Sequence, residues 1–233
     1  MNMSIKDAIN IAGPLGYPAK MPGTSYGISA HACLTGSKLA KIEGSTCHGC
    51  YALKANYLYP SVAMAHEKRL AGIAHPSWTI AMVTLLNAAH ARGTGRNGAI
   101  ESGWHRWHDS GDIQSVAHLT KICAVAAMTS HIRHWLPTRE LGLVKQYQAQ
   151  GGAVPSNLVI RVSATMVDGP ATKAWPTTSG VHTKAMHFSP MNDAPAPDGP
   201  LSHICPAPLQ GHKCGTCRAC WSHDVKSVSY RLH

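Results

Sequence analysis

The chain has 233 residues, of which 44% are hydrophobic and 14% are charged, and this predicts one compact domain spanning 1–233. Twenty-one lysines and arginines against eleven acidic residues give a formal net charge of +10, which favours a nucleic acid or phosphorylated partner. The sequence has no apolar run of about eighteen residues, which argues against a membrane partner. Its first residues lack the apolar segment of a signal peptide, so we expect a cytoplasmic protein whose cysteines stay reduced and bind metal.

The first half of the chain predicts an irregular beginning followed by helices. Residues 1–30 are rich in glycine, proline and serine, which predicts an extended N-terminal segment. Residues 50–75 predict a helix with an interruption at Pro60, and residues 76–93 predict a second helix that Gly93 closes. Residues 98–112 then predict a strand that ends in a Ser-Gly-Asp turn.

The second half predicts strands that alternate with helices. A helix is expected over 113–130, a strand over 131–140 and a helix over 141–152. Residues 157–165 form the clearest strand, and 181–189 predict a fourth. Strands separated by helices of about a dozen residues indicate right-handed βαβ units. We therefore predict an α/β fold, a partial or irregular (β/α) barrel over 31–191, with a cysteine-rich, metal-bound C-terminal segment over 192–233.

Seven of the eight cysteines fall into two groups. These are Cys33, Cys47 and Cys50 near the N-terminus, and Cys205, Cys214, Cys217 and Cys220 near the C-terminus. Thiolates at short spacing are soft ligands that suit one metal centre. Four of them can close a coordination shell, whereas three leave a position open, where chemistry can occur. The eighth, Cys123, lies in the middle of a predicted helix and is expected to fill the core.

The metal itself is left open by the cysteine pattern. The C-x2-C-x2-C spacing of the second group resembles the iron–sulfur loops of ferredoxins. Zinc is the alternative, because C-x2-C also builds zinc sites. In one such arrangement Cys47 and Cys50 join Cys214 and Cys217 in a single zinc ribbon, but this leaves the other three grouped cysteines unused.

Polar residues follow the predicted strands, at the edge where ligands bind in parallel α/β sheets. The candidate catalytic residues are Asp109, Asp112 and Arg161, and the candidate cofactor-binding residues are His108, Ser110, Gly111 and Ser163. His187 and Ser189 would complete the ring after the fourth strand. A helix from Ile113 would offer its N-terminus to a carboxylate or phosphate, and the alternative is that Asp112 only caps this helix.

Three motifs carry a resemblance to a known family. The segments CHGCYA at 47–52, RWHDSGD at 106–112 and CGTCRACW at 214–221 resemble the phage-encoded gene-product-88-like family, over about residues 25–221. The first motif is also similar to phage proteins related to radical S-adenosylmethionine enzymes. The resemblance implies one or two [4Fe-4S] clusters. The three-cysteine cluster would bind S-adenosylmethionine and yield an adenosyl radical, while the four-cysteine cluster would carry electrons from an electron donor.

The chain departs from the usual radical S-adenosylmethionine pattern, C-x3-C-x2-C, because thirteen residues separate Cys33 from Cys47. The usual Gly-Gly-Glu motif is also absent, with Ser110-Gly111-Asp112 as a candidate stand-in. The first hypothesis is an iron–sulfur enzyme of the host cytoplasm that modifies nucleotides or DNA of a phage. The second is a zinc-stabilised basic nucleic-acid-binding protein without catalysis. The sequence leaves the oligomeric state unknown.

Overall fold

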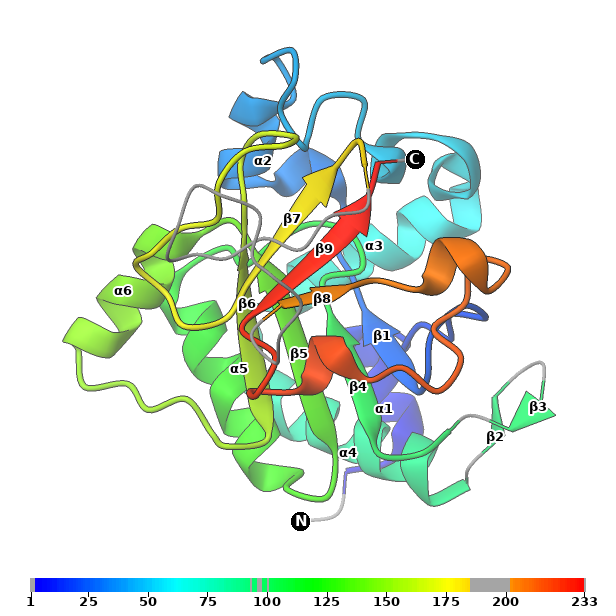
Figure 1. Ribbon diagram of the computed structural model, residues 1–233. Helices are drawn as coiled ribbons and strands as arrows, with labels where there is room; N and C mark the ends of the chain where they lie inside the picture. Colours follow the sequence, from blue (N-terminus) through cyan, green and yellow to red (C-terminus); the bar gives the residue numbers. More distant parts are fainter. Residues whose placement is uncertain (1–2, 93, 96–97, 100, 185–201, 233) are drawn as a thin grey trace.

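A computed structural model describes residues 3–92, 94–95, 98–99, 101–184 and 202–232 of the chain. Seven strands form one parallel sheet in the order β1-β4-β5-β6-β7-β9-β8 (Figure 1). They are β1 (Thr24–Tyr26), β4 (Trp104–Trp107), β5 (Arg133–Thr138), β6 (Leu158–Ser163), β7 (Thr178–His182), β8 (Ser202–Ile204) and β9 (Ser227–Arg231). Two short strands, β2 (Thr94–Gly95) and β3 (Gly98–Ala99), pair antiparallel outside this sheet.

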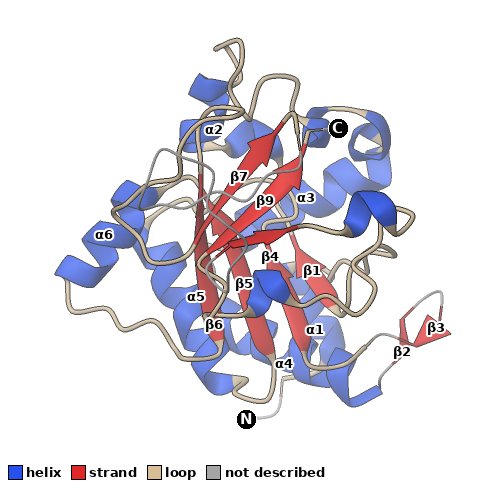
Figure 2. Ribbon diagram, in the orientation of Figure 1, coloured by secondary structure: helices blue, strands red, loops and turns tan. Residues whose placement is uncertain are grey.

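Helices and the C-terminal segment cover the two faces of the sheet. The α-helices are α1 (Ile5–Ala12), α2 (Leu34–Leu39), α3 (Pro60–Gly72), α4 (Trp78–Arg92), α5 (Val116–Met128) and α6 (Leu141–Ala149). The 3-10 helices are η1 (Ala30–Ala32), η2 (Tyr51–Leu53), η3 (Ala55–Leu58), η4 (Ala207–Leu209) and η5 (Ala219–Trp221). Figure 2 shows α1, α4 and α5 behind the strands, and Figure 1 shows the segment of η5, coloured orange-red, in front of them. No helix in the described residues is long and apolar enough to cross a membrane.

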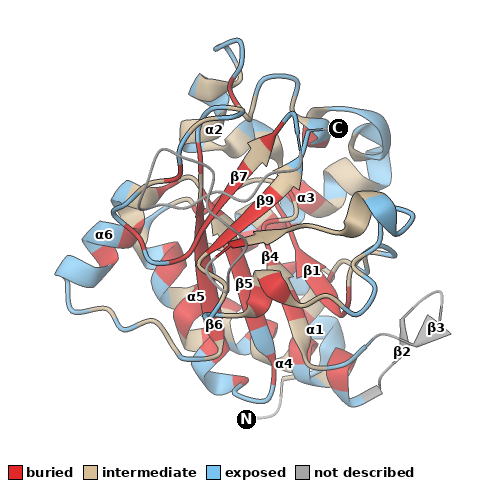
Figure 3. Ribbon diagram, viewed as in Figure 1, coloured by how far each residue is buried: buried red, intermediate tan, exposed pale blue. Residues whose placement is uncertain are grey.

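Successive side chains of the central strands point to opposite faces, as the strand period of two requires. Trp107 faces the helices and belongs to the hydrophobic core. Trp104 and Trp135 face the other way, where their rings lie 5.7 Å and 5.1 Å from the ring of Trp221 on the C-terminal segment. The central strands are therefore buried from both sides, as Figure 3 shows.

The predicted α/β fold with a parallel sheet is confirmed. Closure into a barrel is not confirmed, because β1 and β8 each have one neighbour in the sheet formed by the described residues. The strands predicted over 98–112, 131–140 and 157–165 correspond to β4, β5 and β6. The cysteine-rich segment follows the sheet as predicted, but nothing in the structure shows that it is bound to metal.

Two helix boundaries differ from the prediction. Pro60 begins α3 and is preceded by the turns η2 and η3, because proline fits the first position of a helix and not its interior. Helix α5 begins at Val116, where the hydroxyl of Ser115 accepts a hydrogen bond from the backbone of His118. The alternative that Asp112 caps this helix is therefore wrong.

The N-terminal segment is more regular than predicted. It contains α1, whose first turn Ser4 caps by accepting a hydrogen bond from the Asp7 backbone, and the edge strand β1. The buried Tyr26 of β1 donates a hydrogen bond of 2.6 Å to the carbonyl of Ala12 at the end of α1. Further along the sheet, β7 stops at His182. The rest of the predicted fourth strand, 185–189 with both predicted polar residues, lies outside the described residues.

Candidate functional site

The loop over 33–50, which carries the first cysteine group, lies on the carboxyl edge of the sheet, where the parallel strands end. The carboxylate of Glu140, just after β5, accepts hydrogen bonds from the backbone nitrogen and the hydroxyl of Thr35, at 2.7 and 2.8 Å. The hydroxyl of Thr46 donates to the carbonyl of Ala164, just after β6, at 3.0 Å. These two anchors hold the loop over the ends of β5 and β6.

The three cysteines of the first group lie close together. A Cβ on Gly36 would stand 3.4 Å from Sγ of Cys33 and 3.6 Å from Sγ of Cys47, so these sulfurs are at most about 7 Å apart. Burial above all raises the pKa of the Cys33 thiol to about 12, and the nearby Asp112 carboxylate acts in the same direction. The thiols of Cys47 and Cys50 also raise this pKa, which places all three within electrostatic reach.

A cation accompanies this group. Burial raises the pKa of the Cys47 thiol, whereas the positive charge of the nearby Arg139 guanidinium opposes the rise. The Nη1 atom of Arg139 also donates to the carbonyl of Ala164 at 2.5 Å. With raised pKa values the thiols of Cys33 and Cys47 are protonated near neutral pH, so metal binding would release protons. Arg139 would then offset part of the thiolate charge.

Asp112 is buried and joins the loop after β4 to the end of β5. One carboxylate oxygen accepts from the hydroxyl of Thr138 at 2.6 Å and from the backbone of Ile113 at 2.8 Å. The other accepts from the backbone of Arg139 at 2.8 Å. Burial raises the pKa of Asp112 to about 6, although these hydrogen bonds act against the rise. Asp112 thus positions the residues around the first cysteine group, and its predicted catalytic role stays a prediction.

His108 and Asp109 carry buried polar atoms that have no hydrogen-bond partner among the described residues. These are both ring nitrogens of His108 and Oδ1 of Asp109. Burial lowers the pKa of His108 to about 3, so the ring is neutral at physiological pH. The backbone carbonyl of Asp109 accepts a 2.6 Å hydrogen bond from Tyr51, the residue after Cys50. Buried polar atoms without partners require an explanation, and a ligand is one.

The remaining predicted cofactor residues have structural contacts. The hydroxyl of Ser110 donates to the carbonyl of Ile28, whose backbone nitrogen donates back to Ser110 at 3.0 Å. Gly111 has a φ of +74°, and a Cβ there would stand 2.3 Å from Cγ1 of Ile28, so only glycine fits. The hydroxyl of Ser163 lies 3.1 Å from that of Ser179 on β7. A cofactor role for these residues stays a prediction.

Arg161 is fully buried and organises the C-terminal cysteine segment. Its guanidinium donates to the backbone carbonyls of Thr178 (3.3 Å), Ala219 (2.8 Å), Cys220 (3.0 Å), Ser222 (2.7 Å) and Val225 (2.8 Å). The contacts that the structure shows therefore fix the turn around η5. The catalytic role predicted for Arg161 stays untested.

The four cysteines of the second group also lie within electrostatic reach of one another. Burial raises the pKa values of Cys205, Cys214 and Cys220, that of Cys220 to about 12. Cys217 raises the pKa of Cys205 and of Cys214 further, and Cys205 and Cys214 raise that of Cys220. The structure therefore brings together the predicted ligands of the second site.

Two neighbours of this group were missed by sequence reasoning. Nε2 of His203 on β8 lies 3.2 Å from Sγ of Cys217, and the hydroxyl of Tyr230 on β9 lies 3.1 Å from Sγ of Cys220. His203 stands two residues before Cys205, a spacing that could have marked it as a candidate ligand. Tyr230 had no such signal, because its contact depends on strand pairing. The same holds for Glu140, the residue that anchors the first cysteine loop and that sequence reasoning also missed.

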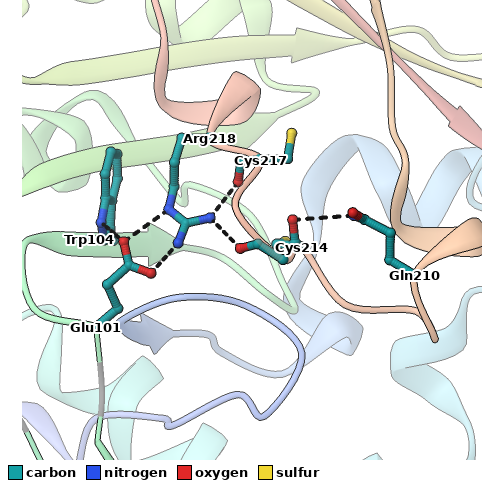
Figure 4. A network of polar contacts seen from close by, with 7 residues as sticks. Glu101, Trp104, Gln210, Cys214, Cys217 and Arg218 are labelled. Carbon is teal, nitrogen blue, oxygen red and sulfur yellow. Dashed lines mark hydrogen bonds and ion pairs between the residues drawn. The ribbon is translucent and has the colours of Figure 1, made fainter.

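Arg218 holds the second cysteine loop in place, as Figure 4 shows. Its Nη1 atom donates to the carbonyls of Gly215 and Cys217, at 2.7 and 2.6 Å. Its guanidinium forms an ion pair with Glu101 and lies over the ring of Trp104, 5.3 Å from the ring centroid. The loop is thereby attached to the segment that leads into β4.

The donor types of both groups fit a thiolate-bound metal centre, since clusters of iron and sulfide take cysteine thiolates on separate irons. Within the described parts of the chain, however, no three His, Cys, Asp or Glu side chains are arranged to hold one metal ion. Metal binding by the two groups thus stays a prediction. The expected core role of Cys123 is confirmed, because it belongs to the hydrophobic core.

The geometry defines a parallel α/β protein with two gathered groups of cysteines, one on the carboxyl edge of its sheet and one on its C-terminal segment. The family model described as gene product 88 matches residues 6–223. The chain therefore belongs to the gene product 88 family, as the three motifs predict. No curated protein and no solved structure was found to match it. The resemblance to radical S-adenosylmethionine proteins receives no support from these comparisons.

Proposed function

We propose that the protein is an iron–sulfur enzyme whose reaction takes place at the carboxyl edge of the sheet. The observation that carries this proposal is the convergence of Cys33, Cys47 and Cys50 beside polar residues of β4 and β5. Three thiols leave one position of a metal centre open, and ligands of parallel α/β sheets bind at this edge. Nucleotides or nucleic acid are the proposed substrate class, because the chain carries a net charge of +10.

The residues of the chain have separate roles in this proposal. The first three cysteines would hold a [4Fe-4S] cluster, and the four C-terminal cysteines would hold a second. Such a cluster supplies one-electron reduction of S-adenosylmethionine, the chemistry of the proteins that the first motif resembles. Arg139 compensates thiolate charge, Asp112 and Glu140 position the loop, and Asp109 offers its carboxylate to a ligand.

Metal analysis of protein purified without oxygen tests the proposal. Brown protein with about eight irons and eight sulfides is the expected result, as two four-iron clusters require. The Cys33→Ala and Cys220→Ala variants are each expected to lose about four irons. Cys123→Ala is the matched control, because it removes a buried thiol outside both groups and is expected to keep all the iron. Colourless protein with zinc in place of iron would contradict the proposal.

A second candidate is a zinc-stabilised nucleic-acid-binding protein without catalysis. It is favoured by the 3.2 Å contact between His203 and Cys217, because mixed histidine and cysteine ligands are typical of structural zinc sites. The same metal analysis separates the two candidates. One or two zinc ions per chain, lost when His203 or the C-terminal cysteines are replaced, would establish the second.

A further inference from the structure

Tyr51, the residue after Cys50, presents an exposed aromatic ring beside the first cysteine group. Its side chain is 59% exposed, yet its hydroxyl donates a 2.6 Å hydrogen bond to the carbonyl of Asp109. Its ring also packs edge-on against Tyr57, with the ring centroids 5.7 Å apart. A ring fixed in this way loses little conformational entropy when a planar group of a ligand covers it.

Cations also lie along the carboxyl edge of the sheet on which this ring is held. Nζ of Lys54 lies 3.5 Å from the point where a Cβ on Gly49 would stand, so the ammonium group lies over the CHGC turn. The exposed Lys184 and Arg231 lie at the carboxyl ends of β7 and β9. Because parallel strands end at one edge, these cations share the edge of the sheet that carries the first cysteine loop.

Exposed Asp168 lies within electrostatic reach of Lys184 and partly offsets its charge, whereas lysines outnumber acidic residues in the segment that carries Tyr51. Residues 31–68 carry the exposed lysines Lys38, Lys41, Lys54 and Lys68 against the exposed acids Glu43 and Glu67. The Glu140 carboxylate is bound to Thr35, and Asp112 is buried. Together with the net charge of +10, this charge distribution complements a polyanion.

The segment that follows Tyr51 in the chain carries further exposed apolar side chains. Leu58 at the end of η3 is 64% exposed, Tyr59 is 59% exposed and Met64 on α3 is 69% exposed. We call Tyr51, Lys54 and these three residues the Tyr51 surface. Aromatic and apolar groups interleaved with lysines are typical of proteins that bind single strands, whose unpaired bases can stack on them.

We infer that the Tyr51 surface binds single-stranded nucleic acid, with a base stacked on the ring of Tyr51 and a phosphate near Lys54. A duplex keeps its bases stacked inside and cannot use the ring, and an acidic protein would use the lysines but offer no planar partner. The binding itself is independent of the proposed function. Only its role as substrate binding rests on that function, because the bound strand would lie beside the first cysteine group.

Fluorescence anisotropy with a labelled oligothymidylate of about 12 nucleotides tests the inference on the full chain. We expect Tyr51→Ala to weaken binding by about 5-fold to 150-fold, the loss that corresponds to one stacked base. Tyr51→Phe keeps the ring but loses the hydrogen bond to Asp109, so it is expected to bind more weakly than wild type and more tightly than Tyr51→Ala. Lys54→Ala is expected to lower the slope of log affinity against log salt by about 0.7, one phosphate contact. Tyr17→Ala, which removes another exposed tyrosine, is the matched control.

The outcomes separate this inference from the proposed function, because the metal content of each variant is measured alongside. Binding that needs Tyr51 but not Tyr17, and that a duplex of the same length does not compete away, supports the inference. Equal binding by Tyr51→Ala and Tyr17→Ala overturns the inference. Wild-type protein that binds no oligothymidylate, whatever its iron content, also overturns it. Tyr51-dependent binding by protein that holds zinc and no iron supports the inference and refutes the proposed iron–sulfur function.

Discussion

The carboxylate of Glu140 binds Thr35 through both of its oxygens, one on the backbone nitrogen at 2.7 Å and one on the hydroxyl at 2.8 Å. Thr35 stands two residues after Cys33, and Glu140 stands two residues after the last residue of β5. A single buried side chain therefore fixes the beginning of the first cysteine loop to the carboxyl edge of the sheet.

Replacing Glu140 by Gln is expected to loosen this loop. The amide offers one acceptor in place of two and turns a donor toward Thr35, so the free energy of unfolding falls by about 1–3 kcal/mol. Urea unfolding measures this change, and the rate of iron loss to a chelator is expected to rise with it. Glu43→Gln, an exposed carboxylate of the same loop, is the control. Equal stability and equal iron loss in the two variants would show that Glu140 is not an anchor.

Replacing Arg161 by Met is expected to release the turn that carries Cys220. Several buried backbone carbonyls lose their donor, which costs about 3 kcal/mol or more of unfolding free energy. In metal-free protein, thiols of the second group are then expected to react faster with a thiol reagent, while those of the first group keep their rate. Arg133→Met, an exposed arginine of β5, is the control. Unchanged thiol reactivity would contradict the role assigned to Arg161.

Buried histidines predict that the fold loses stability in mild acid. Thr24 Oγ1 lies 3.2 Å from Nε2 of His90 and 2.8 Å from Nδ1 of His105, and Thr129 Oγ1 lies 2.9 Å from Nε2 of His134. Burial lowers the pKa of His90 to about 4, that of His134 to about 3, and that of His105 well below its ordinary value. Below about pH 6.5 the unfolded chain therefore binds more protons than the folded chain.

Stability is then fully present above about pH 6.5 and falls as the pH drops, by up to about 1.4 kcal/mol per pH unit for each histidine. The raised pKa of Asp112, about 6, acts with the opposite sign, because its contribution is lost as the pH rises through that value. Urea midpoints between about pH 7.5 and about pH 5 measure the net slope. His134→Gln is expected to flatten the slope, with the exposed His48→Gln as control. A midpoint independent of pH would refute the prediction.

Replacing His203 by Ala is expected to change the second cysteine group alone. The His203 imidazole contacts Cys217, a predicted metal ligand. Removing a group that hydrogen-bonds to a ligand usually lowers metal affinity about 10-fold to 100-fold, and we expect the same here. Competition with a chelator measures this affinity, and metal held by the first group serves as an internal reference. His212→Ala, an exposed histidine of the same segment, is the control. Unchanged affinity in His203→Ala would leave the 3.2 Å contact without a role in metal binding.

Much of the sheet could be predicted because its central strands carry their own local signals. The β-branched run of β6 lies between turn residues, and β4 and β5 precede helices with clear apolar content. Cysteine spacing likewise indicated the two groups. Local patterns failed for β1, β8 and β9, because strands this short, with serine at two of the five positions of β9, form only when the sheet provides neighbours.

The candidate site was harder to predict than the strands. Arg161 lies in a clear strand pattern, but four of the five carbonyls that it binds come from residues more than fifty positions later in the chain. Asp112 reads as a helix cap from local sequence, whereas its partners Thr138 and Arg139 come from the neighbouring strand. Such contacts follow from the register of parallel strands, which residue types alone do not reveal.

The placement of β9 between β7 and β8 has a consequence for chelation. Because β8 and β9 are paired, the intervening chain starts and ends at fixed points, and the backbone of Cys205 donates to Ser229 at 2.9 Å. The chain entropy lost on closing this loop is therefore lost during folding and not during metal binding. The second cysteine group would act as a preformed chelating ring, with a high effective concentration of each thiol for the others. A free peptide spanning 202–231 would bind the same metal more weakly than the folded protein.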